Sequence, residues 1–442
     1  MLIERDIWSI IIYGLTAYGL AWGISNTRRL IEAPFLYSVG MAIILCPQLF
    51  VATNHYWRVP QQAFRVFCIM VVLCTVALFW GYSRGKKSSS LNQKPPKYRW
   101  IIDDNRLFKL GFAIAALGTF GAVQVRSLGE IEGLWRGWPV YWYTLSRLTL
   151  PGISLILISY FQSKKLYRLL IALAFSFFPL SAITASGRRS MTFTLPFIYL
   201  LPFLIYKPKF KIPRTVVIGS LLASLIVVYA FPYWRGEFRE GRYLSIIRER
   251  PVAEIVTNMF SGERDKTLEI IDGMIVTGAH YELNRYGFGI DRVYNSLIHR
   301  YVPGGLLGHD FKASLMIGTG ISRDWVSSVY GIPVAFYTAK TAFSELFGEF
   351  SFFGCIAVFY VGYVFGRAYG AVRNYFDGRA IIFLAFFITL PAGLPYGSLL
   401  SSLVTQLPNI LIMLAAFKWC LVKEPLNVYQ SYPDVEPKIH LT

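Results

Sequence analysis

Long runs of hydrophobic residues, separated by shorter polar segments, dominate the chain. An α-helix needs about 20 apolar residues to cross the hydrocarbon core of a bilayer, and the runs approach this length. They lie at 7–24, 34–53, 62–82, 107–125, 145–161, 167–184, 191–206, 214–231, 350–371, 379–395 and 402–420. The pattern therefore predicts an all-α polytopic integral membrane protein with about eleven transmembrane helices.

Composition agrees with the membrane interpretation. Of the 442 residues, 55% are hydrophobic, 17% are aromatic and only 16% are charged. Soluble globular proteins carry about 25% charged residues. The run at 7–24 has no basic segment before it and is followed by Arg28 and Arg29, so we expect it to remain as a helix and not to be cleaved as a signal peptide.

The runs divide the chain into four parts. Residues 1–231 form an N-terminal bundle of about eight helices, and residues 350–420 add about three more. Between them, residues 232–349 form a large extramembrane loop with helical segments, and residues 421–442 form a tail. Long insertions of this kind usually carry function, so the loop is expected to hold part of the site.

Positive charge sets the expected orientation. Lys and Arg gather in alternate connections, including Arg28–Arg29, the segment 84–106 and the segment 207–214. The positive-inside rule places these connections in the cytoplasm. The N-terminus and residues 232–349 are then outside, and the C-terminus is cytoplasmic. Because these membrane anchors supply much of the net charge of +19, nucleic-acid binding is a poor explanation of it.

Two adjacent arginines, Arg188 and Arg189, run against this charge bias. They occupy the predicted outer turn between the sixth and seventh runs. The planar guanidinium fork matches two oxygens of a phosphate, and a charge at the membrane edge suggests function. The alternative is that both side chains extend to lipid headgroups.

The outer loop contains two segments of the form GxGIxR, "GFGIDR" (287–292) and "GTGISR" (318–323). Glycines let backbone N–H groups approach an anion, and Arg292 and Arg323 would complete the contact. Ordinary glycine-rich turns are the alternative. Neither segment resembles a Walker loop or a dinucleotide-binding fingerprint.

Candidates for proton chemistry lie in the loop and at its end. His309 and Asp310, in "PGGLLGHDF", would suit a base that activates a hydroxyl, although a lone loop histidine is often only a surface group. Glu345 and Glu349 are four residues apart, on one helical face at the membrane edge, and so require a partner arginine or a polar cavity. The cysteines and histidines show no CxxC or HExxH spacing, so no metal site is expected.

The segment "TAFSELFGEFSFFGCIAVFYVGYVFG" (341–366) resembles the late motif of the Wzy-type O-antigen polymerases, also called oligosaccharide repeat-unit polymerases. Glu345, Leu346, Phe347, Phe350 and Gly354 match the family pattern. Glu349 and Ser351 stand where Asn and Gly are usual. The "SGRR" segment, "YVPGGLLGHDF" and the spacing from Arg126 to Gly137 look like further family features.

This resemblance implies a GT-C-like glycosyltransferase of the bacterial inner membrane. Such an enzyme joins undecaprenyl-pyrophosphate-linked oligosaccharide repeat units into surface polysaccharide on the periplasmic face. Its partners would be the glycan donor and acceptor, membrane lipids and a chain-length regulator, with no cofactor, nucleotide sugar or metal. The residues expected to serve it are Arg188, Arg189, Arg292 and Arg323 for pyrophosphate, His309, Asp310 and then Glu345 for catalysis, and Glu349 and Arg126 in secondary roles.

Two other functions stay open. A glycan ligase would use the same donor with another acceptor, but the H-N-x-x-L-like motif of ligases is not visible. A flippase or other transporter would show two related halves and charges at mid-membrane depth, and the sequence shows neither.

Overall fold

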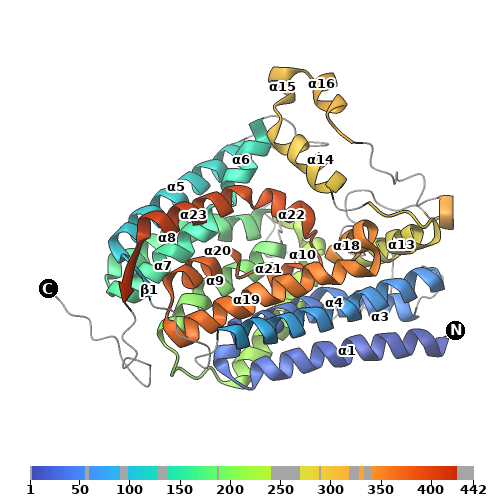
Figure 1. Cartoon of the computed structure of the whole chain (residues 1–442), viewed down its shortest axis with the longest axis horizontal. Helices are drawn as coiled ribbons and strands as arrows, with labels where there is room; N and C mark the ends of the chain where they lie inside the picture. The colour runs from blue at the N-terminus through green and yellow to red at the C-terminus, as the bar shows by residue number, and fades with distance from the viewer. Residues whose placement is uncertain are drawn as a thin grey trace.

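The computed structural model describes residues 2–54, 59–89, 98–127, 138–186, 189–239, 269–287, 290–317, 328–332 and 341–425. These residues form a helical bundle with two groups of helices that meet in a common core (Figure 1). The first group lies along the lower side of Figure 1. It comprises α1 (Leu2–Ile24), α2 (Ala33–Gly40), α3 (Cys46–Asn54), α4 (Gln61–Ser88), α18 (Ala342–Phe350) and α19 (Cys355–Tyr375).

The second group lies above and to the left of the first (Figure 1). α5, α7, α8 and α9 share a smaller core of their own around Ile153 and Ile156. The helices are α5 (Asp104–Ser127), α6 (Trp138–Ser146), α7 (Thr149–Ser163), α8 (Leu166–Ser186), α9 (Arg189–Tyr206), α10 (Arg214–Arg239), α20 (Gly378–Phe387), α21 (Leu390–Gly393), α22 (Leu400–Thr405) and α23 (Leu407–Cys420).

Helices are found at every predicted hydrophobic run. Six helical stretches within the described residues are long and apolar enough to cross a membrane, and five shorter apolar helices accompany them. The six are Glu4–Ile24, Ala33–Asn54, Gln61–Ser88, Asp104–Ser127, Pro139–Ser163 and Ala342–Tyr375. The chain is thus a helical membrane protein. The count of eleven spans and the GT-C-like arrangement stay predictions.

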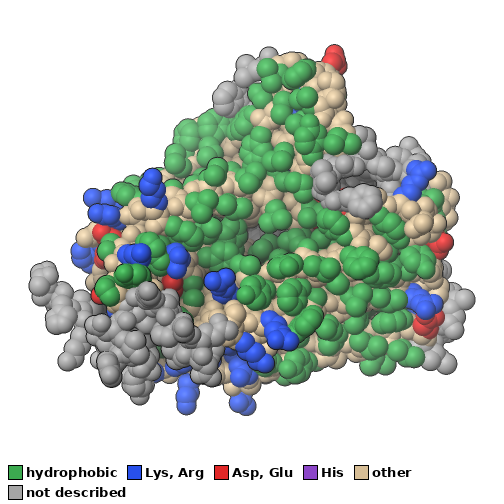
Figure 2. Space-filling model, in the orientation of Figure 1, with side chains coloured by type: hydrophobic (Ala, Val, Ile, Leu, Met, Phe, Trp, Pro, Cys, Tyr) green, Lys and Arg blue, Asp and Glu red, His purple; other side chains and the backbone are tan. Residues whose placement is uncertain are grey.

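Charge is distributed unevenly over the surface. Hydrophobic side chains cover the middle of the face in Figure 2, and Lys and Arg gather toward its left and lower edges. We call this the lysine-rich end. It includes the last turns of α4 and α23, with Lys86, Lys87 and Lys418, and the last turn of α19, with Arg373. α13, α14, α18 and α22 lie toward the opposite end (Figure 1).

The expectation of an all-α chain misses one element at the lysine-rich end. β1 (Tyr98–Ile102) pairs antiparallel with β2 (Leu421–Pro425), so that Ile102 lies opposite Leu421. Arg99 and Glu424 form an ion pair of 2.7 Å across the ribbon. Neither strand was predicted, because each is stabilised by a partner more than three hundred residues away and not by its local sequence.

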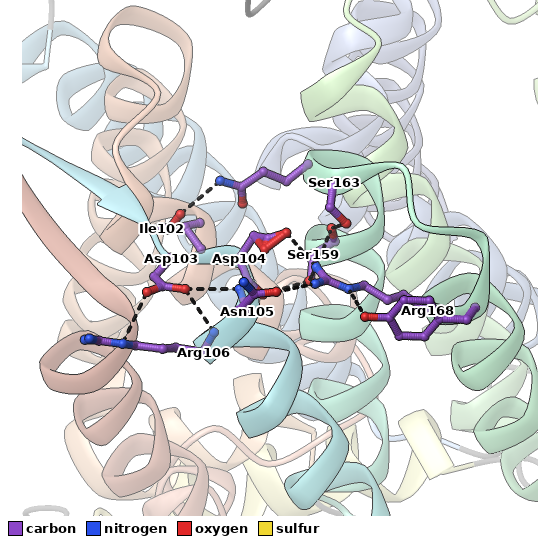
Figure 3. Close-up of polar contacts among 10 residues, drawn as sticks. Ile102, Asp103, Asp104, Asn105, Arg106, Ser159, Ser163 and Arg168 are labelled. Carbon is purple, nitrogen blue, oxygen red and sulfur yellow. Dashed lines mark hydrogen bonds and ion pairs between the residues drawn. The ribbon is translucent and has the colours of Figure 1, made fainter. Parts of the chain in front are cut away.

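A buried arginine joins three helices near this ribbon (Figure 3). Arg168 in α8 is fully buried and forms a 2.7 Å ion pair with Asp104 of α5. Its guanidinium also donates to Asn105 Oδ1 at 2.7 Å and to the Ser159 hydroxyl of α7. Every one of these acceptors belongs to the chain, so Arg168 is a structural arginine.

Apart from the end of α10 and most of α18, the described helices of the segment 232–349 lie in two places. α13 (Glu269–Glu282) packs against α3, α4 and α18, and its first buried N–H, that of Ile270, donates to Gln48 Oε1 at 2.8 Å. The remaining helices project from the bundle (Figure 1). They are α14 (Ile290–Tyr301), α15 (Gly304–Leu307) and α16 (His309–Ser314). Part of this long segment is therefore built into the core.

Glycines bring the backbones of α4 and α19 into contact. A Cβ atom on Gly85 would overlap the Tyr363 carbonyl oxygen, and one on Gly366 would overlap the Tyr82 carbonyl oxygen. Small residues of this kind let membrane helices approach closely, which is how such helices gain packing energy.

Replacing Gly366 by alanine is therefore expected to destabilise the protein by about 1–3 kcal/mol, the usual cost of overpacking. Gly14→Ala is the matched control, because Gly14 is also helical but a Cβ atom there would meet no heavy atom within 4 Å. Unfolding of the purified chain in mixed micelles measures both variants. Equal stability of the two would contradict the close approach of α4 and α19.

Candidate functional site

Two arginines from distant parts of the chain lie near the same end of α22, toward the end of the molecule opposite the lysine-rich end. Arg147 follows α6 directly, and Arg300 lies in the last turn of α14. Both are half-buried. They are close enough for Arg147 to contribute to a lowered pKa of Arg300. We call them the arginine pair.

Contacts with Thr405 and Tyr143 fix the position of Arg147. Its Nη1 donates to Thr405 Oγ1 at 2.8 Å, and its Nη2 donates to the Tyr143 hydroxyl at 3.1 Å. Its guanidinium carbon also lies 4.9 Å from the centre of the Tyr143 ring. Thr405 donates its own proton to the Ser402 carbonyl at 2.8 Å, which turns a lone pair toward Arg147.

Arg300 is held through its neighbours. The hydroxyl of Tyr301 donates to the Val404 carbonyl of α22 at 2.9 Å. Lys312 of α16 donates to the His299 carbonyl at 2.6 Å. Removal from water lowers the pKa of Arg300, and the like charge of Arg147 lowers it further.

The arginine pair differs from Arg168, because no described carboxylate forms an ion pair with either of its members. Arg168 has Asp104 beside it, whereas no carboxylate in the described part of the chain forms an ion pair with Arg147 or Arg300. Two like charges near each other in a half-buried place cost free energy unless an anion lies between them. The arrangement suits a multivalent anion with phosphate-like geometry.

Glu345 accepts hydrogen bonds at the start of α22, the helix whose last residues contact Arg147 and Tyr301. Its Oε1 accepts hydrogen bonds from the hydroxyls of Ser398 at 2.5 Å and Ser401 at 2.9 Å. Its Oε2 accepts from the Leu400 N–H at 2.8 Å. A carboxylate at a helix N-terminus satisfies free N–H groups and complements the helix dipole. Glu345 thus fixes the start of α22, and the end of α22 carries Val404 and Thr405.

The start of the first GxGIxR segment lies against the other glutamate of α18. The N–H of Gly287 donates to the Gly348 carbonyl at 2.8 Å, and a side chain at Gly287 would collide with the Glu349 carboxylate. His280 donates from Nδ1 to the Arg285 carbonyl at 2.8 Å. Its Nε2 would lie 2.6 Å from a Cβ on Gly348, so this histidine also packs against α18.

The predicted site residues fall in different places. Glu345 and Glu349 are both buried in α18, where their spacing of four residues places them on one face of the helix. His309 and Asp310 are exposed on α16, which projects away from α18 (Figure 1). Arg126 is exposed at the end of α5. The others lie outside the described residues, either entirely or in their side chains: Arg188, Arg189, Arg292 and Arg323.

Sequence reasoning missed both members of the arginine pair. A signal existed for Arg147, which is a charge inside the predicted run 145–161. Arg300 carries no such signal, because it lies in an amphipathic helix with several other polar residues. Arg300 becomes a candidate only because the fold places it near the charge of Arg147.

Comparison with known proteins finds no relative. No family model, no curated protein and no solved structure matches the chain.

Proposed function

We propose that this protein is a membrane glycosyltransferase that polymerises undecaprenyl-pyrophosphate-linked oligosaccharide repeat units into surface polysaccharide. The observation that carries the proposal is the arginine pair: two half-buried cations without a carboxylate partner among the described residues of a membrane protein. A pyrophosphate on a lipid carrier supplies the missing negative charge. The resemblance of the segment 341–366 to repeat-unit polymerases supplies the substrate class.

The reaction needs charge stabilisation where the arginines lie. A hydroxyl oxygen of the acceptor glycan attacks the anomeric carbon of the donor glycan. The bond from that carbon to the pyrophosphate oxygen breaks, and the electron pair leaves with the pyrophosphate. Arg147 and Arg300 would bind the departing group as its negative charge grows, which lowers the energy of the transition state.

The acceptor hydroxyl must lose a proton. We assign this step to His309 or Asp310, since Lys312 ties their helix to the residue next to Arg300. Glu345 becomes a positioning residue, because the chain already supplies donors to both of its oxygens. Arg188, Arg189, Arg292 and Arg323 stay proposed as further pyrophosphate contacts, with Glu349 and Arg126 in secondary roles.

The location follows from the same proposal. The positive-inside rule puts the lysine-rich end in the cytoplasm of a bacterial cell and the arginine pair on the periplasmic side of the inner membrane. The N-terminus would then be periplasmic and the C-terminus cytoplasmic.

The direct test incubates the purified full chain with lipid-linked repeat units from its source strain, without any nucleotide sugar. A ladder of longer glycans and release of undecaprenyl pyrophosphate is the expected result. Release of free glycan without a ladder would indicate hydrolysis. Transfer only to an added lipid A core would indicate a ligase, and movement of intact substrate across vesicles would indicate a transporter. Each of these three results would overturn the polymerase proposal.

A further inference from the structure

A cavity of about 520 Å³ lies at the lysine-rich end, between α1, α4 and α19. These three helices run side by side in Figure 1. Trp22 and Phe79 contribute aromatic walls, and Lys87 and Arg373 contribute cations. The cavity is far from the arginine pair and plays no part in the proposed reaction.

One cation of the cavity, Lys86, is already paired with a carboxylate of the protein. Glu32 is buried, and its two carboxylate oxygens lie 3.0 and 2.9 Å from Lys86 Nζ. The hydroxyl of Tyr82 donates to the same carboxylate. Lys86 Nζ also lies 5.9 Å from the centre of the Trp22 ring. This network pairs Glu32 with Lys86 and Tyr82 within the protein, so Glu32 is not available to the other cations of the cavity.

Lys87 and Arg373 are the other two cations that line the cavity. Both are exposed, and neither forms an ion pair with a carboxylate in the described part of the chain. They come from different helices, α4 and α19, and line one cavity. Ser83 and Asn374 add polar groups beside them. The mouth of the cavity is therefore suited to an anion with several oxygen acceptors.

The surface next to the cavity is apolar. On α4, Leu73, Val76 and Trp80 are exposed at helical spacing, and the same helix face continues to Lys87. On α1, Tyr18 is 61% exposed one turn before Trp22. A ligand with its phosphate at Lys87 and Arg373 would thus have an apolar surface for attached acyl chains. A free phosphate would use only the mouth.

We propose that this cavity binds the headgroup of an anionic phospholipid from the leaflet at the lysine-rich end. Its phosphate contacts Lys87 and Arg373, its glycerol portion enters the cavity beside Trp22, and its acyl chains lie along α1 and α4. By the positive-inside rule this leaflet is the cytoplasmic one, where anionic lipids attract basic residues near the membrane surface.

The test measures lipid retention by the full chain. The protein is purified from nanodiscs that contain phosphatidylcholine and phosphatidylglycerol, and bound lipid is identified by native mass spectrometry. The wild type is expected to retain phosphatidylglycerol preferentially. Lys87→Gln and Arg373→Gln should each reduce that preference about fivefold, and the double variant about 25-fold, since each basic residue near a membrane contributes about the same attraction.

Arg84→Gln is the matched control. Arg84 is exposed on the same helix, one turn from Lys87, but it lies over Trp80 and does not line the cavity. Its replacement should leave the preference unchanged. An equal loss in this control would mean general attraction of the membrane surface and would overturn the site.

A second arm separates lipid from free phosphate. In detergent without phospholipid, phosphatidylglycerol with short acyl chains should raise the unfolding temperature of the wild type but not of the double variant. Inorganic phosphate at the same concentration should have little effect. Equal stabilisation by inorganic phosphate, or no preference for phosphatidylglycerol in the first arm, would overturn the proposal.

Discussion

Arg300→Ala is expected to reduce the rate of glycan polymerisation by about two to three orders of magnitude, which is the usual cost of removing one transition-state contact to a developing anion. Arg147→Ala should have an effect of the same order, because in the proposed reaction both guanidinium groups bind the same departing pyrophosphate. Arg300→Lys should fall between alanine and wild type, since lysine keeps the charge but loses the planar fork. The rate of ladder formation by purified protein measures all three.

The control for these variants is Arg65→Ala. Arg65 lies near the start of α4, and its side chain is 53% exposed in a 3.4 Å ion pair with Glu4. Exposed pairs contribute little to stability, so activity and folding should both persist. If Arg147→Ala and Arg300→Ala fold normally and polymerise at the wild-type rate, the arginine pair does not bind the leaving group.

Glu345→Ala is expected to destabilise the protein by about 3 kcal/mol or more, because hydrogen bonds to a buried charge are strong and the Ser398, Leu400 and Ser401 donors would lose their acceptor. Activity should fall together with stability, because α22 carries Thr405 and Val404, which contact Arg147 and Tyr301. Glu345→Gln keeps one oxygen acceptor and should be intermediate in both respects. Unfolding in mixed micelles and the ladder assay are measured on the same preparations.

These two variants separate a positioning role from direct catalysis. If Glu345 were instead the catalytic base, Glu345→Gln would abolish polymerisation without a matching loss of stability. Glu282→Ala is the control, because Glu282 is an exposed acid at the end of α13. Its replacement should change the free energy of unfolding by less than about 0.5 kcal/mol.

Helix positions were predictable because an apolar run of sufficient length is a local property. The run 107–125 lies within α5 (Asp104–Ser127), and the run 62–82 lies within α4 (Gln61–Ser88). In a membrane the backbone must satisfy its hydrogen bonds within the segment, so hydrophobicity and helix go together. The spacing of Glu345 and Glu349 likewise placed both on one face of α18, and the structure shows that this face is buried.

Partners in space were not predictable. Nothing local in "VYWYTLSRL" indicates that Arg147 will donate a hydrogen bond to Thr405, and nothing in "SLIHRY" indicates that Arg300 will lie near the charge of Arg147. The pairing of β1 with β2 is hidden for the same reason. The three hydrogen-bond donors to Glu345 were not predictable either, because they lie more than fifty residues later in the chain.

By itself, the sequence determined that this is a helical membrane protein, where its helices lie and which end is rich in lysine, because hydrophobic length and charge act segment by segment. Only the tertiary structure decided which charges are neutralised. Arg168 forms an ion pair with Asp104 and Lys86 forms one with Glu32, whereas Arg300 lies near the like charge of Arg147. The free energy of a buried charge depends on what folding places next to it, and that is fixed by packing among distant segments.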